Sequence, residues 1–234
     1  MSKNINNFVS KSDEKSVHVA VREIKEESYR ALRWAGYSWG QAQSAGRISG
    51  VAEIIWGNGI SAAVADAKRI FVTKRPVKVK QVSNAVLLNT RGLSTTMAAA
   101  FAVAISQSQP DEKVFVKGSN FGPEVAAAVW DVKRKPKKII TWGKSNPEKS
   151  QDLSILENGD LVAHSRLKSM EAIPSKFRAL WFVICHEESP SGDVIMEKKE
   201  QVHKMNQALT QGVEVSKSQW KKLCAKSYKF LVPE

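Results

Sequence analysis

The stretch at residues 33–41 constrains the fold more than any other part of the chain, because it joins two helical patterns. Apolar residues recur at helical spacing over residues 17–35 and again over residues 39–56. Gly36 suits the position that follows a helix, and Ser38 suits the N-cap of the next one. The sequence therefore predicts a tight pair of helices with two tryptophans and one tyrosine at the elbow.

The second helix carries small residues along one side. Its inner stripe consists of Ala42, Ala45, Ser49, Ala52 and Ile55, with Gly46 and Gly50 alongside. Small side chains let another backbone approach closely, so the stripe predicts a close helix–helix contact. The same stripe could instead serve as a partner surface. A third, short helix is expected at residues 60–70, after the stop signal at residues 57–59.

The pattern changes after residue 75, where short strands alternate with helices. Strands are expected at residues 77–82, 85–89, 114–116, 139–142, 153–156, 161–164 and 179–185, and helices at 93–105, 123–132, 197–209 and 217–226. Asn158 and Gly159 predict a hairpin between two of the strands. We expect an α/β (or α+β) fold, with an N-terminal helical hairpin packed on a mixed sheet body. The expected division is a flexible tail at 1–15, the hairpin segment at 16–70 and one compact body at 75–234.

Composition favours a cytoplasmic protein. The chain has 234 residues and two cysteines far apart in the sequence, which is typical of reduced thiols. No apolar run reaches the roughly 18 residues that a membrane span needs. The N-terminus is polar and unlike a signal peptide. We therefore expect no membrane association.

The formal net charge of +13 favours an anionic partner. Lysines cluster at residues 74–80 and 133–138, which leaves open a lysine-rich nucleic-acid-binding module. Lysine supplies point charge, whereas arginine is the residue that reads base edges with two hydrogen bonds. A solvated basic surface explains the charge equally well.

The best positional clue to a ligand is a pair of loops that follow predicted strands. The chain contains no P-loop, dinucleotide fingerprint or nucleophile elbow. Lys117, Ser119 and Asn120 lead from a strand to a helix N-terminus, which favours a phosphate or carboxylate. Lys144 follows the next strand in the same way. Loops at the carboxyl ends of such strands meet at one sheet edge, where we expect an anionic metabolite.

Further candidate ligand-binding residues lie elsewhere. Tyr37 and Trp39 at the helical elbow form a secondary candidate. His186 and His164 fall at predicted strand ends, and would form a site with Cys185 if their strands were neighbours. Strand alternation predicts instead that Cys185 lies in the core and His186 outside. The spacing of histidines and cysteines predicts no metal site, and nothing identifies a cofactor.

The two ends of the chain resemble an uncharacterised bacterial family, domain of unknown function 3726. The likeness rests on residues 23–24 and 31–40, and on residues 212–215 with Trp220, Leu223 and 228–234. Gln43 and Ser44 stand where the family has acidic residues, so a role for those acids does not carry over. The family continues into a serine-, arginine- and glycine-rich tail, and its activity is not assigned.

A weaker resemblance links the N-terminal helices to the type-2 malate/lactate dehydrogenases. Those proteins carry a catalytic Ser-His-Gly motif after the helix pair. The corresponding stretch here, residues 58–61, contains no histidine. The resemblance therefore implies no catalytic residue.

Three functions remain open from the sequence. The leading hypothesis is a protein of small-molecule metabolism that binds an anionic metabolite at the strand-to-helix loops, as an enzyme or an accessory subunit. The alternatives are the nucleic-acid-binding module and a non-enzymatic oligomeric scaffold. A homo-oligomer and a complex with a partner subunit are both compatible with the sequence.

Overall fold

The computed structural model describes residues 15–68, 77–82, 85–90, 95–118, 122–131, 138–145, 151–167, 175–177 and 179–231. The chain divides into two compact units. Unit 1 comprises Met1–Ile70 and Lys204–Glu234, and unit 2 comprises Phe71–His203. The sequence placed residues 75–234 in one body, whereas the C-terminal segment groups with the N-terminal helices. Residues 1–14 of the expected tail lie outside the described residues.

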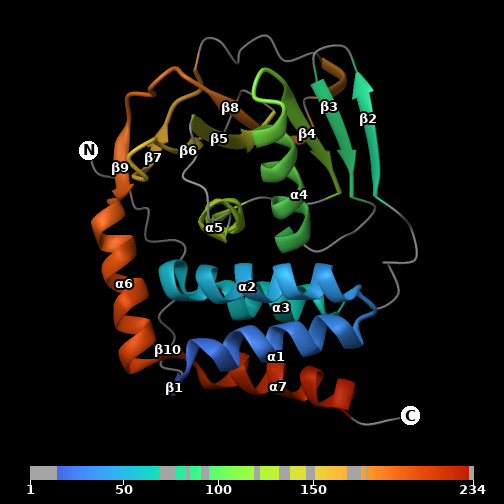
Figure 1. Cartoon of the computed structure of the whole chain (residues 1–234), viewed down its shortest axis with the longest axis vertical. Coiled ribbons are helices and arrows are strands. Elements are labelled where there is room, and N and C mark those ends of the chain that lie inside the picture. The colour runs from blue at the N-terminus through green and yellow to red at the C-terminus, as the bar shows by residue number, and fades with distance from the viewer. Residues whose placement is uncertain are drawn as a thin grey trace. The chain divides into compact units, whose positions relative to one another are not determined.

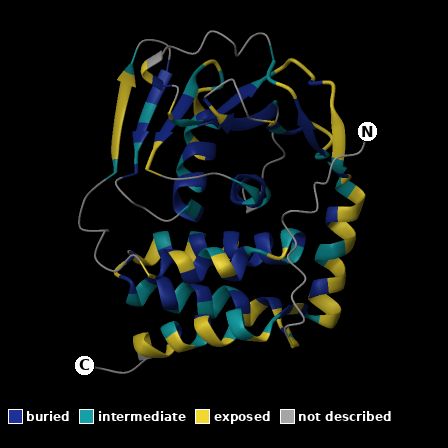
Figure 2. Ribbon diagram, turned by 180° about the vertical axis from the view of Figure 1, so that it is seen from behind, coloured by how far each residue is buried: buried dark blue, intermediate teal, exposed yellow. Residues whose placement is uncertain are grey.

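Unit 1 is mainly helical. Its elements are β1 (Ser16–Val19), α1 (Val21–Trp34), α2 (Trp39–Trp56), α3 (Gly59–Asp66), the C-terminal part of α6 (Lys198–Gln211), β10 (Val213–Ser216) and α7 (Lys217–Leu231), shown in Figure 1. The inner sides of α1 and α2 are buried, whereas α7 presents an exposed outer side (Figure 2).

The predicted helical elbow is confirmed. The Ser38 hydroxyl accepts a hydrogen bond from the Gln41 backbone N–H at 3.4 Å, and the Gln41 side chain accepts one from the Ser38 N–H at 3.1 Å. This reciprocal cap begins α2. Gly36 has a φ of 92°, a left-handed conformation that favours glycine after a helix.

The small-residue side of α2 packs inside unit 1. A Cβ built on Gly46 would lie 2.8 Å from the Lys25 backbone oxygen, and one built on Gly50 would lie 2.8 Å from Cγ of Lys25. Both contacts involve α1, so the predicted close helix–helix contact is confirmed. The positions of Gly46 and Gly50 are occupied within the unit and do not form a free partner surface.

The start of the first helix differs from the prediction. Residues Ser16–Val19 form strand β1, which pairs antiparallel with β10, and α1 begins only at Val21. Ala20 is the N-cap residue of α1, and its backbone N–H donates to the Glu23 carboxylate at 3.1 Å. Pairing with a distant segment here overrides the local helical spacing.

Unit 2 is built on an eight-stranded mixed sheet, which confirms the α/β fold class. Its strands are β2 (Lys78–Val82), β3 (Ala85–Asn89), β4 (Lys113–Lys117), β5 (Ile139–Lys144), β6 (Asp152–Ile155), β7 (Leu161–His164), β8 (Trp181–His186) and β9 (Asp193–Met196). Its helices are α4 (Thr95–Ser108), α5 (Pro123–Asp131), the short turn η4 (Ser175–Phe177) and the first part of α6. The strand order is β2-β3-β4-β8-β5-β6-β7-β9.

Several strand predictions are confirmed by this sheet. β2 lies at an edge, β6 and β7 form the hairpin predicted around Asn158 and Gly159, and β8 is an inner strand between β4 and β5. Strand β9 was not predicted. It has four residues and is mostly exposed, and its apolar run, Val194–Met196, is shorter than the four to eight residues by which buried strands are recognised.

The two faces of the sheet differ in character. One face packs against α4, where the Cys185 thiol lies 3.7 Å from the Ser106 hydroxyl. The opposite face carries an apolar cluster of Ala85, Phe115, Phe177, Phe182 and Ile184. Rings of Phe115 and Phe177 stack with centroids 4.2 Å apart. Among the described residues, no helix combines the length and apolar character needed to cross a bilayer.

Candidate functional site

The carboxyl ends of three parallel strands meet at one edge of the unit 2 sheet. β3 pairs parallel with β4, and both β4 and β5 run antiparallel to the β8 strand between them. β4 and β5 are therefore parallel to each other, and Lys117 and Lys144 lie at the same edge. The two strand ends therefore lie at one edge, as the order of strands and helices predicted. Ser119 and Asn120 lie outside the described residues.

The two lysines emerge on opposite faces of the sheet. Phe115 and Phe182 are cross-strand partners and share a face, so Lys117, two residues beyond Phe115, lies on that face as well. Lys144 pairs with Trp181, and its ammonium lies 5.5 Å from the centroid of that indole. Both lysines are exposed, and a ligand that contacts both must span the end of β8.

A carboxylate of the chain already occupies the helix N-terminus at this edge. The Glu124 side chain accepts hydrogen bonds from the backbone N–H groups of Gly122 and of Glu124 itself. Burial raises the pKa of Glu124, while these hydrogen bonds oppose the rise. The α5 N-terminus is thus occupied by a carboxyl group of the chain itself, where the sequence predicted a bound phosphate or carboxylate.

An ion pair organises the same edge. Arg166 donates to both carboxylate oxygens of Asp152, at 3.2 and 3.3 Å, and to the backbone oxygens of Lys144 and Ser145. The Asp152 side chain is fully buried. Burial raises the pKa of Asp152 even though the Arg166 guanidinium opposes the shift. Arg166 thereby fixes the backbone from which Lys144 projects.

Gly143 makes room for this ion pair. A Cβ at that position would lie 2.1 Å from Oδ1 of Asp152. Glycine is therefore required by the close approach of the carboxylate, since no side chain fits there. Neither Asp152 nor Arg166 was singled out from the sequence.

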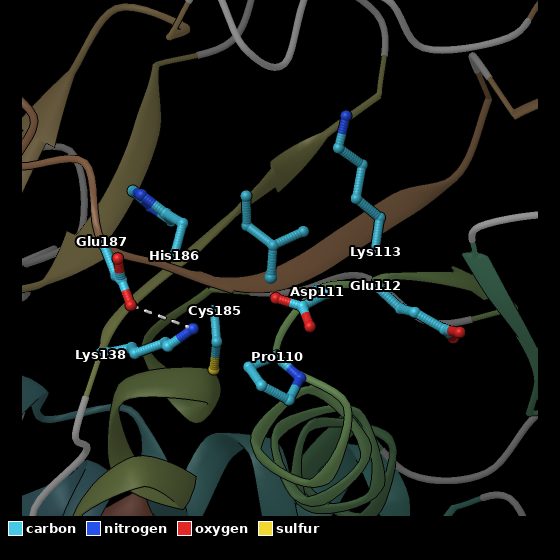
Figure 3. A pocket seen from close by; sticks show the side chains of 9 residues that line it. Pro110, Asp111, Glu112, Lys113, Lys138, Cys185, His186 and Glu187 are labelled. Atoms are coloured by element: carbon cyan, nitrogen blue, oxygen red, sulfur yellow. Dashed lines mark ion pairs between the residues drawn. The ribbon is translucent and has the colours of Figure 1, made fainter.

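His186 lies at the opposite edge of the sheet and lines a pocket of about 420 Å³ (Figure 3). The lining comprises Pro110, Asp111, Glu112, Lys113, Lys138, Ile184, Cys185, His186 and Glu187. His186 and Lys113 point to one side of the sheet and Cys185 to the other. The Lys138 ammonium pairs with the Glu187 carboxylate at 3.3 Å.

His186 and His164 are joined by two hydroxyl groups. The Thr141 Oγ1 lies 2.6 Å from Nε2 of His186 and 2.5 Å from Oγ of Ser154, which lies 2.7 Å from Nε2 of His164. β5 and β6 separate the strands that carry the two histidines, so the histidines do not contact each other directly. Cys185 is buried on the other face, as strand alternation predicted. Thr141 and Ser154 were missed, although each is a polar residue at an inward position of a buried strand.

Burial shifts the pKa values of two residues that line this pocket, His186 and Lys113. Burial lowers the pKa of His186, a nearby Glu188 opposes the shift, and His164 adds to it. Burial and the Arg166 charge lower the pKa of Lys113. His186 is therefore neutral near pH 7.

The elbow residues of unit 1 have different environments. Tyr37 is fully buried, so its ring is part of the core. Trp39 is 69% exposed, and its ring lies 5.9 Å from that of Tyr29 and 5.2 Å from the Arg33 guanidinium. Of this pair only Trp39 presents a surface to solvent. No cluster of three metal-ligating side chains occurs within the described residues.

The sequence matches no family model and no curated protein. The fold is similar to solved dehydrogenases. A malate dehydrogenase from Pyrococcus horikoshii OT3 is 8% identical with a TM-score of 0.64, covering 95% of this chain and 99% of that one. A dehydrogenase from Sinorhizobium meliloti is 7% identical with a TM-score of 0.65, covering 91% and 100%.

A third similar structure is the sulfolactate dehydrogenase of Methanocaldococcus jannaschii. It is 9% identical with a TM-score of 0.63, and the match covers 92% of this chain and 98% of that one. At these identities the likeness extends to the fold alone.

Proposed function

We propose that this protein binds an anionic small molecule at the basic sheet edge marked by Lys117 and Lys144, as an enzyme or accessory subunit of small-molecule metabolism. The observation that carries the proposal is the topology. Two exposed lysines follow parallel strands that end at one edge, separated by the single strand β8. Ligands of α/β sheets bind at such edges.

The similar structures support the ligand class. Malate and sulfolactate, which appear in the names of two of them, are small hydroxy acids with two anionic groups. Neighbouring strands of a sheet lie about 4.8 Å apart, so strands β4 and β5, with β8 between them, are about 10 Å apart. Because the two lysines also emerge on opposite faces, a ligand that contacts both needs two separated anionic groups that reach around the end of β8. Similarity of fold does not identify the residues that bind a ligand, so the ligand must be tested with this chain.

The electrostatic contribution of each lysine is modest and measurable. An exposed ammonium beside an anion contributes about 0.2–1 kcal/mol. Loss of one lysine should therefore weaken binding by about 1.4- to 5-fold, and loss of both by the product of the two effects if they act independently.

The test is titration calorimetry of malate, sulfolactate and inorganic phosphate with the full chain. Lys117→Met, Lys144→Met and their double variant are compared with Lys221→Met, which removes an exposed lysine from α7 in unit 1. We expect saturable binding of at least one dianion. The affinity should fall in Lys117→Met, Lys144→Met and their double variant, and should be unchanged in Lys221→Met. Binding equal in all variants refutes the assignment of the edge. Nuclear magnetic resonance signals of the acid show whether it is converted to a product. Conversion identifies an enzyme, and an unchanged acid identifies a binding subunit.

A second candidate function, single-stranded nucleic-acid binding, is favoured by the composition of α7. The helix carries five lysines and no acidic residue, and Tyr228 on it is 66% exposed. Exposed aromatic rings beside cations stack with bases. Of the lysine clusters noted at residues 74–80 and 133–138, Lys78 and Lys80 lie exposed on β2, and Lys138 pairs with Glu187. The remaining basic residues of both clusters lie outside the described residues. Affinity for an oligonucleotide that falls steeply with salt supports this function, and salt-independent or undetectable binding opposes it.

A further inference from the structure

Three neighbouring strands of unit 2, β2, β3 and β4, carry charge of one sign. Their sequences contain four lysines and no acidic residue. β2 reads Lys-Val-Lys-Gln-Val, so strand alternation places Lys78 and Lys80 on one face and Val79 and Gln81 on the other. Figure 2 shows β2 exposed along nearly its whole length. The lysines of β2 are therefore open to a ligand and segregated to one face.

The strand register places the lysines of β2 and β4 on the same face. Lys78 pairs with Asn89, which pairs in turn with Lys117, so these three side chains form one row across the strands. Lys80 belongs to the next row, which ends at Phe115 in the apolar cluster described above. Because cross-strand partners point to the same side of a sheet, this is the face opposite α4.

The accessible charges are spread over the surface of the sheet. Neighbouring strands lie about 4.8 Å apart, so the backbones of Lys78 and Lys117 are about 10 Å apart, and Lys80 follows Lys78 at about 7 Å along β2. All three lysines are exposed. Within the part of the chain that the structure describes, none of the three forms an ion pair. Their charge is therefore available to an external anion.

The far end of the row is held in place by a buried threonine. Both the backbone N–H and the hydroxyl of Thr90 donate to the backbone oxygen of Lys117, at 3.0 and 2.9 Å. Thr90 is 1% exposed, so these hydrogen bonds are shielded from water. Lys117 thus projects from a fixed backbone.

The surroundings add a charge but no exposed ring. The Lys176 ammonium lies 5.1 Å from the centroid of Phe177, whose ring stacks on Phe115 on this face. Lys176 is exposed, whereas the two phenylalanines are at most 5% exposed. Lys113 shares the face but is partly buried near the Arg166 charge. Bases cannot stack on buried rings, so the surface can contact only the backbone of a nucleic acid.

We propose that Lys78, Lys80, Lys117 and Lys176, the basic face of unit 2, bind the phosphate backbone of a single-stranded nucleic acid that crosses β2, β3 and β4. An extended acidic peptide binds instead by pairing with the backbone of an edge strand, whereas these lysines extend over the face as far as β4. A single small anion gains little from exposed lysines, but a strand of phosphates gains from each contact through the release of counterions.

This surface differs from both sites proposed above. It shares its ligand class with the second candidate function but assigns the ligand to unit 2 instead of α7. It shares Lys117 with the anion site, whereas Lys144 emerges on the opposite face of the sheet. Variants at these positions therefore distinguish the three proposals.

The test is fluorescence anisotropy of the full chain with a labelled oligothymidylate of about 12 nucleotides, between about 50 and 200 mM salt. For single strands the logarithm of the affinity falls by about 0.7 per neutralised phosphate for each tenfold rise in salt, so four contacts give a slope of about −2.8. The variants are Lys78→Gln, Lys80→Gln, Lys117→Gln and Lys176→Gln. Each should reduce the magnitude of the slope by about 0.7.

A transposed lysine is the matched control for net charge. The double variant Val79→Lys with Lys80→Gln keeps the charge of β2 but moves one lysine to the other face, where Val79 is 59% exposed. We expect this variant to bind with the reduced slope of Lys80→Gln alone. A slope restored to that of the parent protein shows that only net charge matters, and overturns the proposal.

Two further variants separate this surface from the other sites. Lys144→Gln on the opposite face and Lys221→Gln on α7 should leave the slope unchanged. A slope that only Lys221→Gln reduces places the ligand on α7 and overturns the basic face while sustaining the second candidate function. Binding that is undetectable, or that depends strongly on base composition, also overturns the proposal. The titrations with malate and sulfolactate decide the anion site independently of these results.

Discussion

Three glycines of unit 1 provide a graded test of the packing between α2 and α3. A Cβ built on Gly59 would lie 1.8 Å from the Ser49 backbone oxygen and 2.6 Å from the Glu53 nitrogen. Both neighbours are helix backbone, which cannot move aside as a flexible side chain can. Gly59→Ala therefore forces α3 away from α2.

Displacing α3 also disrupts its cap. The Glu53 carboxylate accepts the Ile60 backbone N–H at 2.8 Å and is buried. Overpacking costs about 1–3 kcal/mol, and weakening a buried hydrogen bond to a charged group adds about 1–3 kcal/mol. We expect Gly59→Ala to lower the free energy of unfolding by about 2–6 kcal/mol, the sum of the two contributions.

The neighbouring glycines serve as matched controls. Gly57 has a φ of 69° with nothing within 4 Å of its Cβ position, so Gly57→Ala should cost only about 1 kcal/mol of backbone strain. Gly40 lies in α2 with open space, and Gly40→Ala should be neutral or stabilising by up to about 1 kcal/mol. Urea titrations followed by circular dichroism measure all three. A cost for Gly59→Ala no larger than that for Gly57→Ala would refute the steric reasoning.

Three further predictions concern buried polar groups. Burial raises the pKa of Glu53, so the folded protein holds this proton more tightly and loses stability as pH rises from about 4.5 through the folded pKa. In urea unfolding at several pH values, the free energy of unfolding of Glu53→Gln should rise relative to that of the parent protein as pH rises. A difference between the two proteins that stays constant with pH would contradict this. Gly143→Ala should lower the unfolding free energy by about 2–4 kcal/mol, because its Cβ displaces Asp152 from its ion pair, and a cost below about 1 kcal/mol would count against that packing. The pKa of His186 is lowered, so stability should fall as pH drops below about 6.5, and His186→Gln should lessen that fall in the same titrations.

Local signals predicted the helices of unit 1 well. Ser38 caps α2 through its own neighbours in sequence, and Gly57 ends the same helix in the left-handed conformation, so both features follow from a few consecutive residues. β1 and β10 could not be found in this way. Their pairing joins Val17 to Val215, and residues 17–35 by themselves fit a continuous helix. Short strands that depend on a distant partner leave little local pattern.

The candidate site could be predicted only where it depends on the order of elements along the chain. The edge that carries Lys117 and Lys144 followed from the order of strands and helices alone. Asp152 and Arg166 come together because β6 and β7 form a hairpin that sets their positions beside Gly143, and nothing local to either residue indicates the pair. The Glu124 carboxylate at the α5 N-terminus was likewise not anticipated, although an acidic residue in a first helical turn is a common cap.

The two faces of the sheet explain why a shared fold at 7–9% identity leaves the chemistry open. On the face towards α4, residues such as Val183 and Cys185 contribute volume and apolar surface, which many side chains can supply with similar stability. On the opposite face, Thr141 and Ser154 are specified by the hydrogen bonds they make, and an apolar residue at either position leaves a buried partner unpaired. Similarity of fold therefore reflects mainly the first kind of position. Function depends on the second kind, so it must be tested in this chain itself.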